Sequence, residues 1–262
     1  MLNPPDRASV DFPRAVLVTG AGRRMGSAFA ADLAAHGAAV AVHCNRSAAE
    51  AQSVVDDIRQ RGGSACVVRA DFSDRQAVEN LVGEAASALG RPLDLLINNA
   101  SLFEDDDIDS FDWAAWDRHF AVHVDAPVML SRKFAEQLED GGEGLIVNLV
   151  DQRVLKPTPR FFSYALSKSA LWHATRMMAQ ALAPRVRVNA IGPGPTLRSD
   201  RQTEDDFAAQ AGAVLLRRGP ELTEIAATVR YLWQAKSVTG QMIAVDGGQH
   251  LAWQTPDATV GE

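Results

Sequence analysis

Short apolar runs alternate with longer helix-forming stretches along almost the whole chain. Each run is rich in aliphatic residues and lies between turn formers, which is typical of buried strands. We predict seven strands at AVLVTG (15–20), AAVAVHC (38–44), SACVVRAD (64–71), LDLLINNA (93–100), GLIVNLV (144–150), RVRVNAIGPG (185–194) and QMIAVDGG (241–248).

The stretches between these runs have the length and composition of helices. MGSAFAADLAAH is rich in alanine and stops at Gly37, and Ser47 can cap a helix that runs to Arg61. Further helices are predicted over about 73–90, 112–139, 161–182 and 221–234. Because strands and helices alternate without a break in composition, we predict one α/β domain with a doubly wound, seven-stranded parallel sheet.

The two ends of the chain depart from this pattern. Residues 1–13 are polar and contain three prolines, which predicts a flexible arm before a domain at 14–248. In the tail 249–262, Trp253 covers a substrate pocket (its own or a neighbour's) or packs at a subunit contact. The segment near 197–215, after the sixth strand, is predicted as a substrate lid.

Composition narrows the partners and the compartment. The net charge of −7 favours solubility and argues against nucleic-acid or anionic-membrane partners, although a local basic pocket is compatible with it. Cys44 and Cys66 form no disulfide framework and no zinc spacing. Since no signal peptide and no run of the ~20 apolar residues of a membrane span is present, we expect a cytoplasmic protein with reduced thiols.

An acidic run in segment 103–112 (FEDDDIDSFD) raises the question of calcium. The run lacks the glycine and the distal glutamate of an EF-hand loop. We therefore predict a solvated surface loop and no metal site.

The first predicted strand leads into TGAGRRMG (19–26), a glycine-rich turn before a helix. Such a turn exposes backbone N–H groups and the positive end of a helix dipole to a pyrophosphate. Gly20, Gly22 and Gly26 are the predicted cradle, although their spacing is not GxGxxG. Arg23 is expected to face solvent or to screen the phosphates.

The end of the second strand predicts the cofactor. An acid at this point usually binds the ribose of NAD, whereas an arginine holds the 2′-phosphate of NADP. The sequence HCNRSAAE offers Arg46 and Ser47 and has no acid before Glu50. We predict NADPH; a solvated Arg46 beside an ordinary helix cap is the alternative.

The pattern YALSK places Tyr164 and Lys168 on one face of a helix that follows the fifth strand. A lysine near a phenol stabilises the phenolate and lowers the pKa of the tyrosine. Tyr164 would then act as an acid or base near neutral pH.

The motifs TGxxxxxG, NNA, YxxxK and PG occur here in the order in which the short-chain dehydrogenase/reductase superfamily has them, and the chain resembles that superfamily over about 14–248. The resemblance implies a Rossmann-type domain, hydride transfer from a nicotinamide and often a homotetramer. It also implies that Tyr164 donates a proton, Lys168 holds the nicotinamide ribose, Asp71 contacts the adenine and Asn99 lies beside the cofactor ribose. The cofactor-binding set that we predict is Gly20, Gly22, Arg24, Met25, Gly26, Arg46, Ser47, Asp71, Phe72, Asn99, Ala100, Ser101, Tyr164, Lys168, Pro193, Gly194 and Thr196.

Several positions depart from the superfamily pattern. Asp151 stands where a serine is usual, His123 replaces an asparagine, and Arg24 replaces the central glycine of the turn. Together with HxxRSAAE and with NNASxF, which brings Ser101 and Phe103, these departures resemble pteridine reductases. The histidine at position 123 is similar to the dihydromonapterin reductase branch.

The residues that depart from the superfamily pattern are chemically compatible with a pterin substrate. A carboxylate at position 151 would repel the oxyanion of a carbonyl substrate, but it can accept hydrogen bonds from an aminopyrimidine or, if burial raises its pKa, deliver a proton. Phe103 offers a flat face for the bicyclic ring, and Arg24 can contact both the pyrophosphate and the pterin. The predicted substrate-binding set is Arg24, Ser101, Phe103, Asp151 and Tyr164, and the catalytic set is Tyr164, Lys168, Asp151 and His123.

Each of these assignments has an alternative. Asp151 marks either pterin chemistry or an inactive site; Phe103 is either a stacking ring or a core residue of its loop; His123 joins a proton relay near Lys168 or packs in its helix. Thr196 binds the cofactor phosphates or caps its loop. We predict an NADPH-dependent reductase of a dihydropterin (dihydromonapterin, dihydrobiopterin or, more weakly, dihydrofolate). The alternatives are a carbonyl reductase acting on a sugar, steroid or acyl thioester, and a non-catalytic NADP(H)-binding regulator.

Overall fold

A single parallel sheet forms the centre of the computed structural model, which describes residues 12–138, 141–199 and 201–255. The strand order is β3-β2-β1-β4-β5-β6-β7. The strands are β1 (Ala15–Val18), β2 (Ala39–Cys44), β3 (Ser64–Arg69), β4 (Leu95–Asn98), β5 (Gly144–Leu149), β6 (Val186–Pro193) and β7 (Met242–Val245). The predicted seven-stranded, doubly wound sheet is confirmed.

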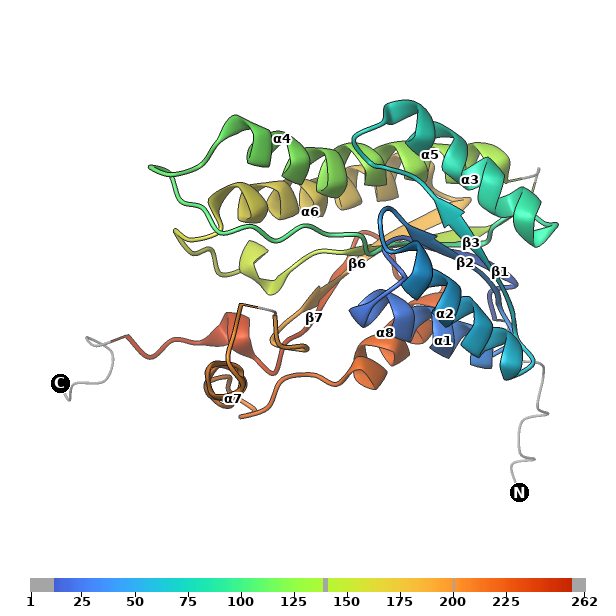
Figure 1. The fold of residues 1–262 in the computed structure, drawn as a ribbon. Coiled ribbons are helices and arrows are strands. Elements are labelled where there is room, and N and C mark those ends of the chain that lie inside the picture. Colours follow the sequence, from blue (N-terminus) through green and yellow to red (C-terminus); the bar gives the residue numbers. More distant parts are fainter. Residues whose placement is uncertain (1–11, 139–140, 200, 256–262) are drawn as a thin grey trace, which may run out of the picture.

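Helices cover both faces of the sheet (Figure 1). One face carries α1 (Arg24–Ala35), α2 (Ala48–Gln60) and α8 (Leu222–Gln234). The other carries α3 (Arg75–Leu89), α4 (Trp113–Phe120), α5 (Ala126–Gln137) and α6 (Phe162–Leu182). No helix of the described residues is long and apolar enough to cross a membrane.

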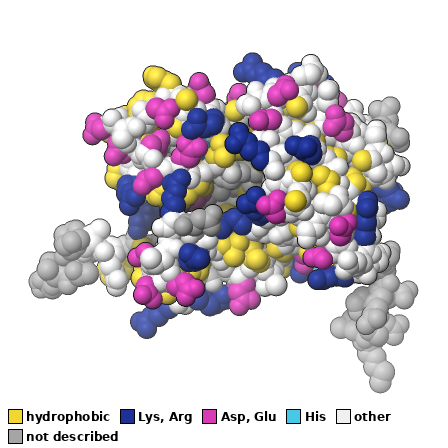
Figure 2. Space-filling model, viewed as in Figure 1, with side chains coloured by type: hydrophobic (Ala, Val, Ile, Leu, Met, Phe, Trp, Pro, Cys, Tyr) yellow, Lys and Arg dark blue, Asp and Glu magenta, His cyan; other side chains and the backbone are white. Residues whose placement is uncertain are grey.

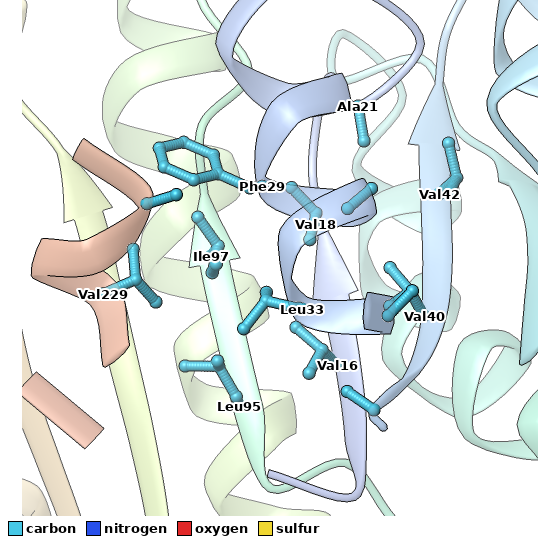
Figure 3. Packing of buried hydrophobic residues seen from close by; sticks show 14 of the residues in the cluster. Val16, Val18, Ala21, Phe29, Leu33, Val40, Val42, Leu95, Ile97 and Val229 are labelled. Atoms are coloured by element: carbon cyan, nitrogen blue, oxygen red, sulfur yellow. The ribbon is translucent and has the colours of Figure 1, made fainter. Parts of the chain in front are cut away.

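The first strand shows why the strands are almost uniformly apolar. Val16 and Val18 pack under Phe29 and Leu33 of α1, as Figure 3 shows, whereas Leu17 packs on the opposite face of the sheet. Because successive strand residues point to opposite faces, a sheet that is covered on both faces needs apolar residues at every position. Full burial of each such side chain contributes about 1.5–3 kcal/mol.

The predicted helix over 112–139 is one continuous helical region with a change of spacing inside it. Between α4 and α5 the chain forms a π-helical turn, η1 (Ala121–Asp125). Pro127 lies four residues after His123 and has no N–H to donate to its carbonyl, which accounts for the irregular turn. His123 is buried at the centre of η1.

Some segments differ from the predictions. The predicted lid contains a helix, α7 (Glu204–Gly212), whose capping box is formed by Thr203 and Asp206. Short 3-10 turns follow β5 (η2, Gln152–Val154) and β7 (η3, Gln249–Leu251). Most of the predicted N-terminal arm (residues 1–11) and the last part of the tail (256–262) lie outside the described residues.

The prediction of a solvated acidic loop at 103–112 is wrong for Asp106. This residue is only 9% exposed, and its carboxylate accepts hydrogen bonds from the backbone and the hydroxyl of Ser163. A buried acid at the start of a helix is stabilised by the unpaired N–H groups there, which the sequence run alone does not reveal. The two cysteines are free thiols, as predicted.

Candidate active site

A cleft of about 1230 Å³ opens where the segments after β1 to β6 leave the sheet. All predicted site residues line this cleft except Gly22, His123 and Lys168. A second depression, of about 890 Å³ between α3 and α5, contains none of them. The location follows from the fold, because the carboxyl ends of parallel strands form a common edge.

The cleft is more basic than the rest of the protein. Seven arginines line it against four carboxylates, whereas the whole chain has a net charge of −7. Figure 2 shows a hollow in the molecular surface with Lys and Arg side chains along its rim. This local charge suits an anionic ligand.

The glycine turn approaches its neighbours too closely for side chains. A Cβ at Gly26 would lie 2.4 Å from the carbonyl oxygen of Gly20 and 2.6 Å from Nδ2 of Asn99. Gly20 has a φ of +63°, in the left-handed region that favours glycine. No side chain caps α1, whose first residues line the cleft, and an uncapped helix start of this kind can bind an anion.

Two predicted residues, Gly22 in the turn and Asn99 after β4, pack closely around the turn. Gly22 lies against the start of α2, where a Cβ would be 3.0 Å from Oγ of Ser47. The amide of Asn99 donates hydrogen bonds to the carbonyls of Thr19 (2.8 Å) and Gly20 (3.2 Å), and therefore holds the turn on β4.

His43, which was not among the predicted residues, also supports the turn. Its Nδ1 accepts a hydrogen bond from the N–H of Gly20 (3.1 Å), and its ring stacks on Phe72 at 4.6 Å. Burial lowers the pKa of His43 to about 4, so the imidazole is neutral and can accept this bond. The sequence feature that could have indicated this role is a single histidine near the carboxyl end of a predicted buried strand.

Arg24 takes the backbone conformation of the glycine that it replaces. Its φ is 55°, and its guanidinium donates to the carbonyls of Arg198 (2.9 Å) and Leu197 (3.3 Å). Arg24 thus connects the start of α1 with the predicted lid while it lines the cleft. Arg23, by contrast, pairs with Glu50 at 2.6 Å and is 62% exposed.

The predicted binding site for the 2′-phosphate has two polar side chains that can contact an anion. Arg46 is exposed on the cleft, and Ser47 begins α2 without a side-chain capping bond. Nearby, Asp71 accepts hydrogen bonds from the N–H and hydroxyl of Ser73, which lower the pKa of its carboxyl group. The predicted residues Met25, Ala100, Pro193, Gly194 and Thr196 complete the wall.

Two of the predicted catalytic residues, Tyr164 and Asp151, are in direct contact in the cleft. The hydroxyl of Tyr164 donates to Oδ2 of Asp151 at 2.8 Å. Asp151 also accepts from the N–H of Arg153 (2.8 Å) and from its guanidinium (3.0 Å). In all three hydrogen bonds the partner group donates and the carboxylate of Asp151 accepts.

The expectation that Tyr164 has a lowered pKa is wrong for this structure. Burial, followed by the charge of Asp151, raises the pKa of Tyr164 well above its ordinary value. The ammonium of Lys168 lies 5.8 Å from the centre of the Tyr164 ring and donates to the carbonyl of Leu149 at 2.7 Å. Burial lowers the pKa of Lys168 itself to about 8.

Phe103 and Phe161 form an aromatic wall of the cleft beside Tyr164 and Asp151. Phe103 packs edge-on against Tyr164 at 4.8 Å and stacks with Phe161 at 4.3 Å. The guanidinium of Arg153 lies over both phenyl rings, at 5.5 and 5.4 Å. Phe161 and Arg153 were not predicted, because their proximity depends on the path of the segment after β5.

His123 connects other parts of the site. Its Nε2 accepts from the N–H of Leu102 (3.1 Å) and lies 3.0 Å from Oγ of Ser101, while Nδ1 lies 2.8 Å from Oγ of Ser167. Both ring nitrogens are thereby engaged, and neither of these bonds goes to Lys168. The contacts describe a residue that holds the loop after β4 on α6.

The predicted lid borders the cleft through Leu197, Gln202, Phe207 and Gln210, among others. Thr196 bonds to the carbonyl of Gly194 at 3.1 Å, as a loop cap does. Trp253 is 60% exposed and does not line the cleft, whereas Gln249 of η3 does.

The family model described as short chain dehydrogenase matches residues 14–208. The chain belongs to this family. Among solved members, the FolM alternative dihydrofolate reductase 1 of Brucella canis, crystallised with NADP, is 55% identical, with a TM-score of 0.90 over 93% of this chain and 96% of that one.

The curated relatives are named for substrates of both classes considered above, pterins and acyl thioesters. The dihydromonapterin reductase of Klebsiella pneumoniae is 31% identical over 91% of this chain and 98% of its own length. The 3-oxoacyl-[acyl-carrier-protein] reductase FabG of Staphylococcus epidermidis is 31% identical over 91% and 99%. The predicted resemblance to the superfamily and to its pteridine reductase-like branch is confirmed.

Proposed function

We propose that the protein is an NADPH-dependent reductase that converts a dihydropterin of the dihydromonapterin or dihydrobiopterin class, and more weakly dihydrofolate, to the tetrahydropterin. The observation that carries the proposal is the hydrogen bond from Tyr164 to Asp151, beside the rings of Phe103 and Phe161 that line the cleft. The 55% identity to a structure named as an alternative dihydrofolate reductase supports the same substrate class.

The residues present fit NADPH. The uncapped start of α1 and the glycine turn before it would hold the pyrophosphate, and Arg46 with Ser47 would hold the 2′-phosphate. Lys168 would hold the nicotinamide ribose; Leu149 takes one of its N–H donors, and an ammonium has three. When bound, the cofactor supplies a hydride to the carbon of a ring C=N bond.

Tyr164 is the group that we assign as proton donor to the ring nitrogen. Its raised pKa means that the phenol keeps its proton at neutral pH, and its hydroxyl lies at the cleft. The positive charge of Lys168 would stabilise the phenolate that forms. Asp151 holds the hydroxyl before transfer and accepts hydrogen bonds from the aminopyrimidine edge.

The carbonyl reductase alternative is weakened by the same carboxylate. An oxyanion that develops next to Asp151 would be repelled, whereas the serine usual at this position would donate to it. The relatedness to FabG nevertheless makes an acyl thioester the appropriate competing substrate for a test. A homotetramer, a cytoplasmic location and the lack of a nucleic-acid partner stay predictions.

The test is an assay of NADPH oxidation with dihydromonapterin, dihydrobiopterin, dihydrofolate and a 3-oxoacyl thioester in parallel. We expect turnover with the dihydropterins and little with the thioester. Turnover of the thioester alone would establish the carbonyl reductase instead. Tight NADPH binding without turnover of any substrate would support the regulator.

A further inference from the structure

Two parallel histidine–serine pairs lie beneath the loop that follows β4. We call residues 101–106 the substrate loop, since they carry Ser101 and Phe103. His119 of α4 and His123 of η1 stack at 5.6 Å with nearly parallel rings. Their Nδ1 atoms face Oγ of Ser163 and Ser167 on α6, at 2.7 and 2.8 Å.

The direction of each hydrogen bond follows from its backbone partner. Nε2 of His119 accepts from the N–H of Glu104 (3.4 Å), just as Nε2 of His123 accepts from that of Leu102 (3.1 Å). A backbone N–H only donates, so the imidazole proton is on Nδ1 and is donated to the serine. Ser163 then donates to Asp106, whereas Ser167 donates to the carbonyl of Tyr164.

Both imidazoles must be neutral for this arrangement. Burial is the main cause that lowers the pKa of His119, with Arg118 and Lys168 acting in the same direction and Glu104 and Asp106 opposing it. Burial also lowers the pKa of His123, with Lys168 and His119 adding to the effect.

Asp106 connects the substrate loop to the start of α6. It accepts from the backbone N–H of Ser163 (3.2 and 3.3 Å), and its carbonyl accepts from the N–H of Phe162 (3.2 Å). Phe161 precedes α6 in a left-handed conformation and provides no side-chain cap. The substrate loop therefore supplies the cap of the helix that carries Tyr164.

From this network we infer that His119, acting through Ser163 and Asp106, is a positioning residue for the dihydropterin site. It sets the distance between Phe103, which would stack on the pterin, and the hydroxyl of Tyr164, which would protonate it. His119 is fully buried and does not line the cleft, so it acts without touching a ligand. The inference rests on the proposed function for the identity of the substrate.

The test compares His119→Phe with His119→Gln, and with His173→Phe as a matched control on the exposed side of α6. Phenylalanine keeps the ring but loses both hydrogen bonds, whereas the glutamine oxygen can still accept from Glu104 N–H. We expect His119→Phe to raise KM for dihydrobiopterin at least ~10-fold with KM for NADPH unchanged. His119→Gln should recover most of that loss, and His173→Phe should behave as wild type.

Amide hydrogen exchange gives a second readout that needs no substrate. Exchange at Glu104, whose N–H donates to His119, should accelerate in His119→Phe and, to a smaller extent, in Ser163→Ala. Unchanged exchange, or equal increases in KM for NADPH and for the pterin, would contradict the positioning role. A wild-type protein inactive on all dihydropterins would overturn the proposed function and the substrate part of this inference together; normal pterin KM in His119→Phe would overturn the inference alone.

Discussion

The hydroxyl of Tyr164 donates a 2.8 Å hydrogen bond to Oδ2 of Asp151. In this arrangement the phenol is a donor and the carboxylate an acceptor, and the negative charge of Asp151 opposes ionisation of the tyrosine. The phenol therefore keeps its proton at neutral pH, and this protonated form is the one that the proposed transfer to a ring nitrogen requires.

Replacing Asp151 by serine should restore the residue usual in the superfamily and impair pterin reduction. Loss of the carboxylate removes the acceptor for Tyr164 and for the aminopyrimidine. We expect kcat/KM for a dihydropterin to fall at least ~10-fold, equivalent to about 1.4 kcal/mol. Steady-state kinetics checks this, with the Kd for NADPH as a control that should stay constant; an unchanged rate would remove Asp151 from the mechanism.

The pKa of Lys168 predicts an alkaline limit to activity. Burial lowers this pKa to about 8, so Lys168 is charged below pH 8 and loses its proton as the pH rises through that value. The pKa of Tyr164 is raised, so the phenol does not titrate in this range. We expect kcat/KM for NADPH, which reports the free enzyme, to decline above about pH 8.

The control for this pH profile is Lys168→Met, which cannot titrate. Its activity should be low at every pH and should lack the decline above pH 8. If the variant keeps the same alkaline limb as the wild type, the limb belongs to another group.

Arg46→Ala should separate the two nicotinamide cofactors. Hydrogen bonds to a charged group contribute about 1.5–3 kcal/mol, so KM for NADPH should rise roughly 10- to 100-fold, while KM for NADH should change little. Arg61→Ala, at the opposite end of α2, is the matched control and should leave both constants unaltered. Equal losses for the two cofactors would contradict the assignment of Arg46 to the 2′-phosphate.

The strands and the glycine turn after β1 were predictable because local sequence determines them. An apolar run such as AVLV, followed by a glycine turn and a helix, is sufficient to place Gly20 and Gly26. Tyr164 and Lys168 were placed by their spacing on one helix. These features depend on residues that are close together in the chain.

The supporting residues were missed because they act across long separations. Asp106 and Ser163 are 57 residues apart, and His43 meets Gly20 only through the pairing of β1 with β2. The pKa of Tyr164 was predicted in the wrong direction for a similar reason. The lysine was visible in the spacing, whereas the burial that outweighs it was not.

Gly26→Ala should weaken cofactor binding while the fold persists. The new Cβ would meet the carbonyl oxygen of Gly20 at 2.4 Å, and moving that backbone would distort the turn. We expect NADPH affinity to fall at least ~10-fold, equivalent to about 1.4 kcal/mol of binding free energy, while the overpacking lowers folding stability by about 1–3 kcal/mol. Fluorescence titration of NADPH measures the change.

Gly83→Ala is the matched control for this substitution. Gly83 lies in the exposed interior of α3, where a Cβ would meet nothing within 4 Å. Alanine there should stabilise the protein by roughly 0.8–1 kcal/mol and leave NADPH binding intact. Similar affinities for the Gly26 and Gly83 variants would show that the turn does not cradle the pyrophosphate.

Two substitutions of Arg24 should separate the effect of this residue on folding stability from its effect on ligand binding. Both Arg24→Gly and Arg24→Ala remove the guanidinium that donates to the carbonyls of Leu197 and Arg198, so both should raise KM for NADPH and for the dihydropterin to a similar extent. Only glycine also relieves the left-handed backbone, which costs a residue with a Cβ about 1–2 kcal/mol. The glycine variant should therefore melt ~2–4 °C or more above the alanine variant. Equal melting temperatures would contradict the strained backbone, and unchanged KM values would show that the connection from α1 to the lid does not shape the site.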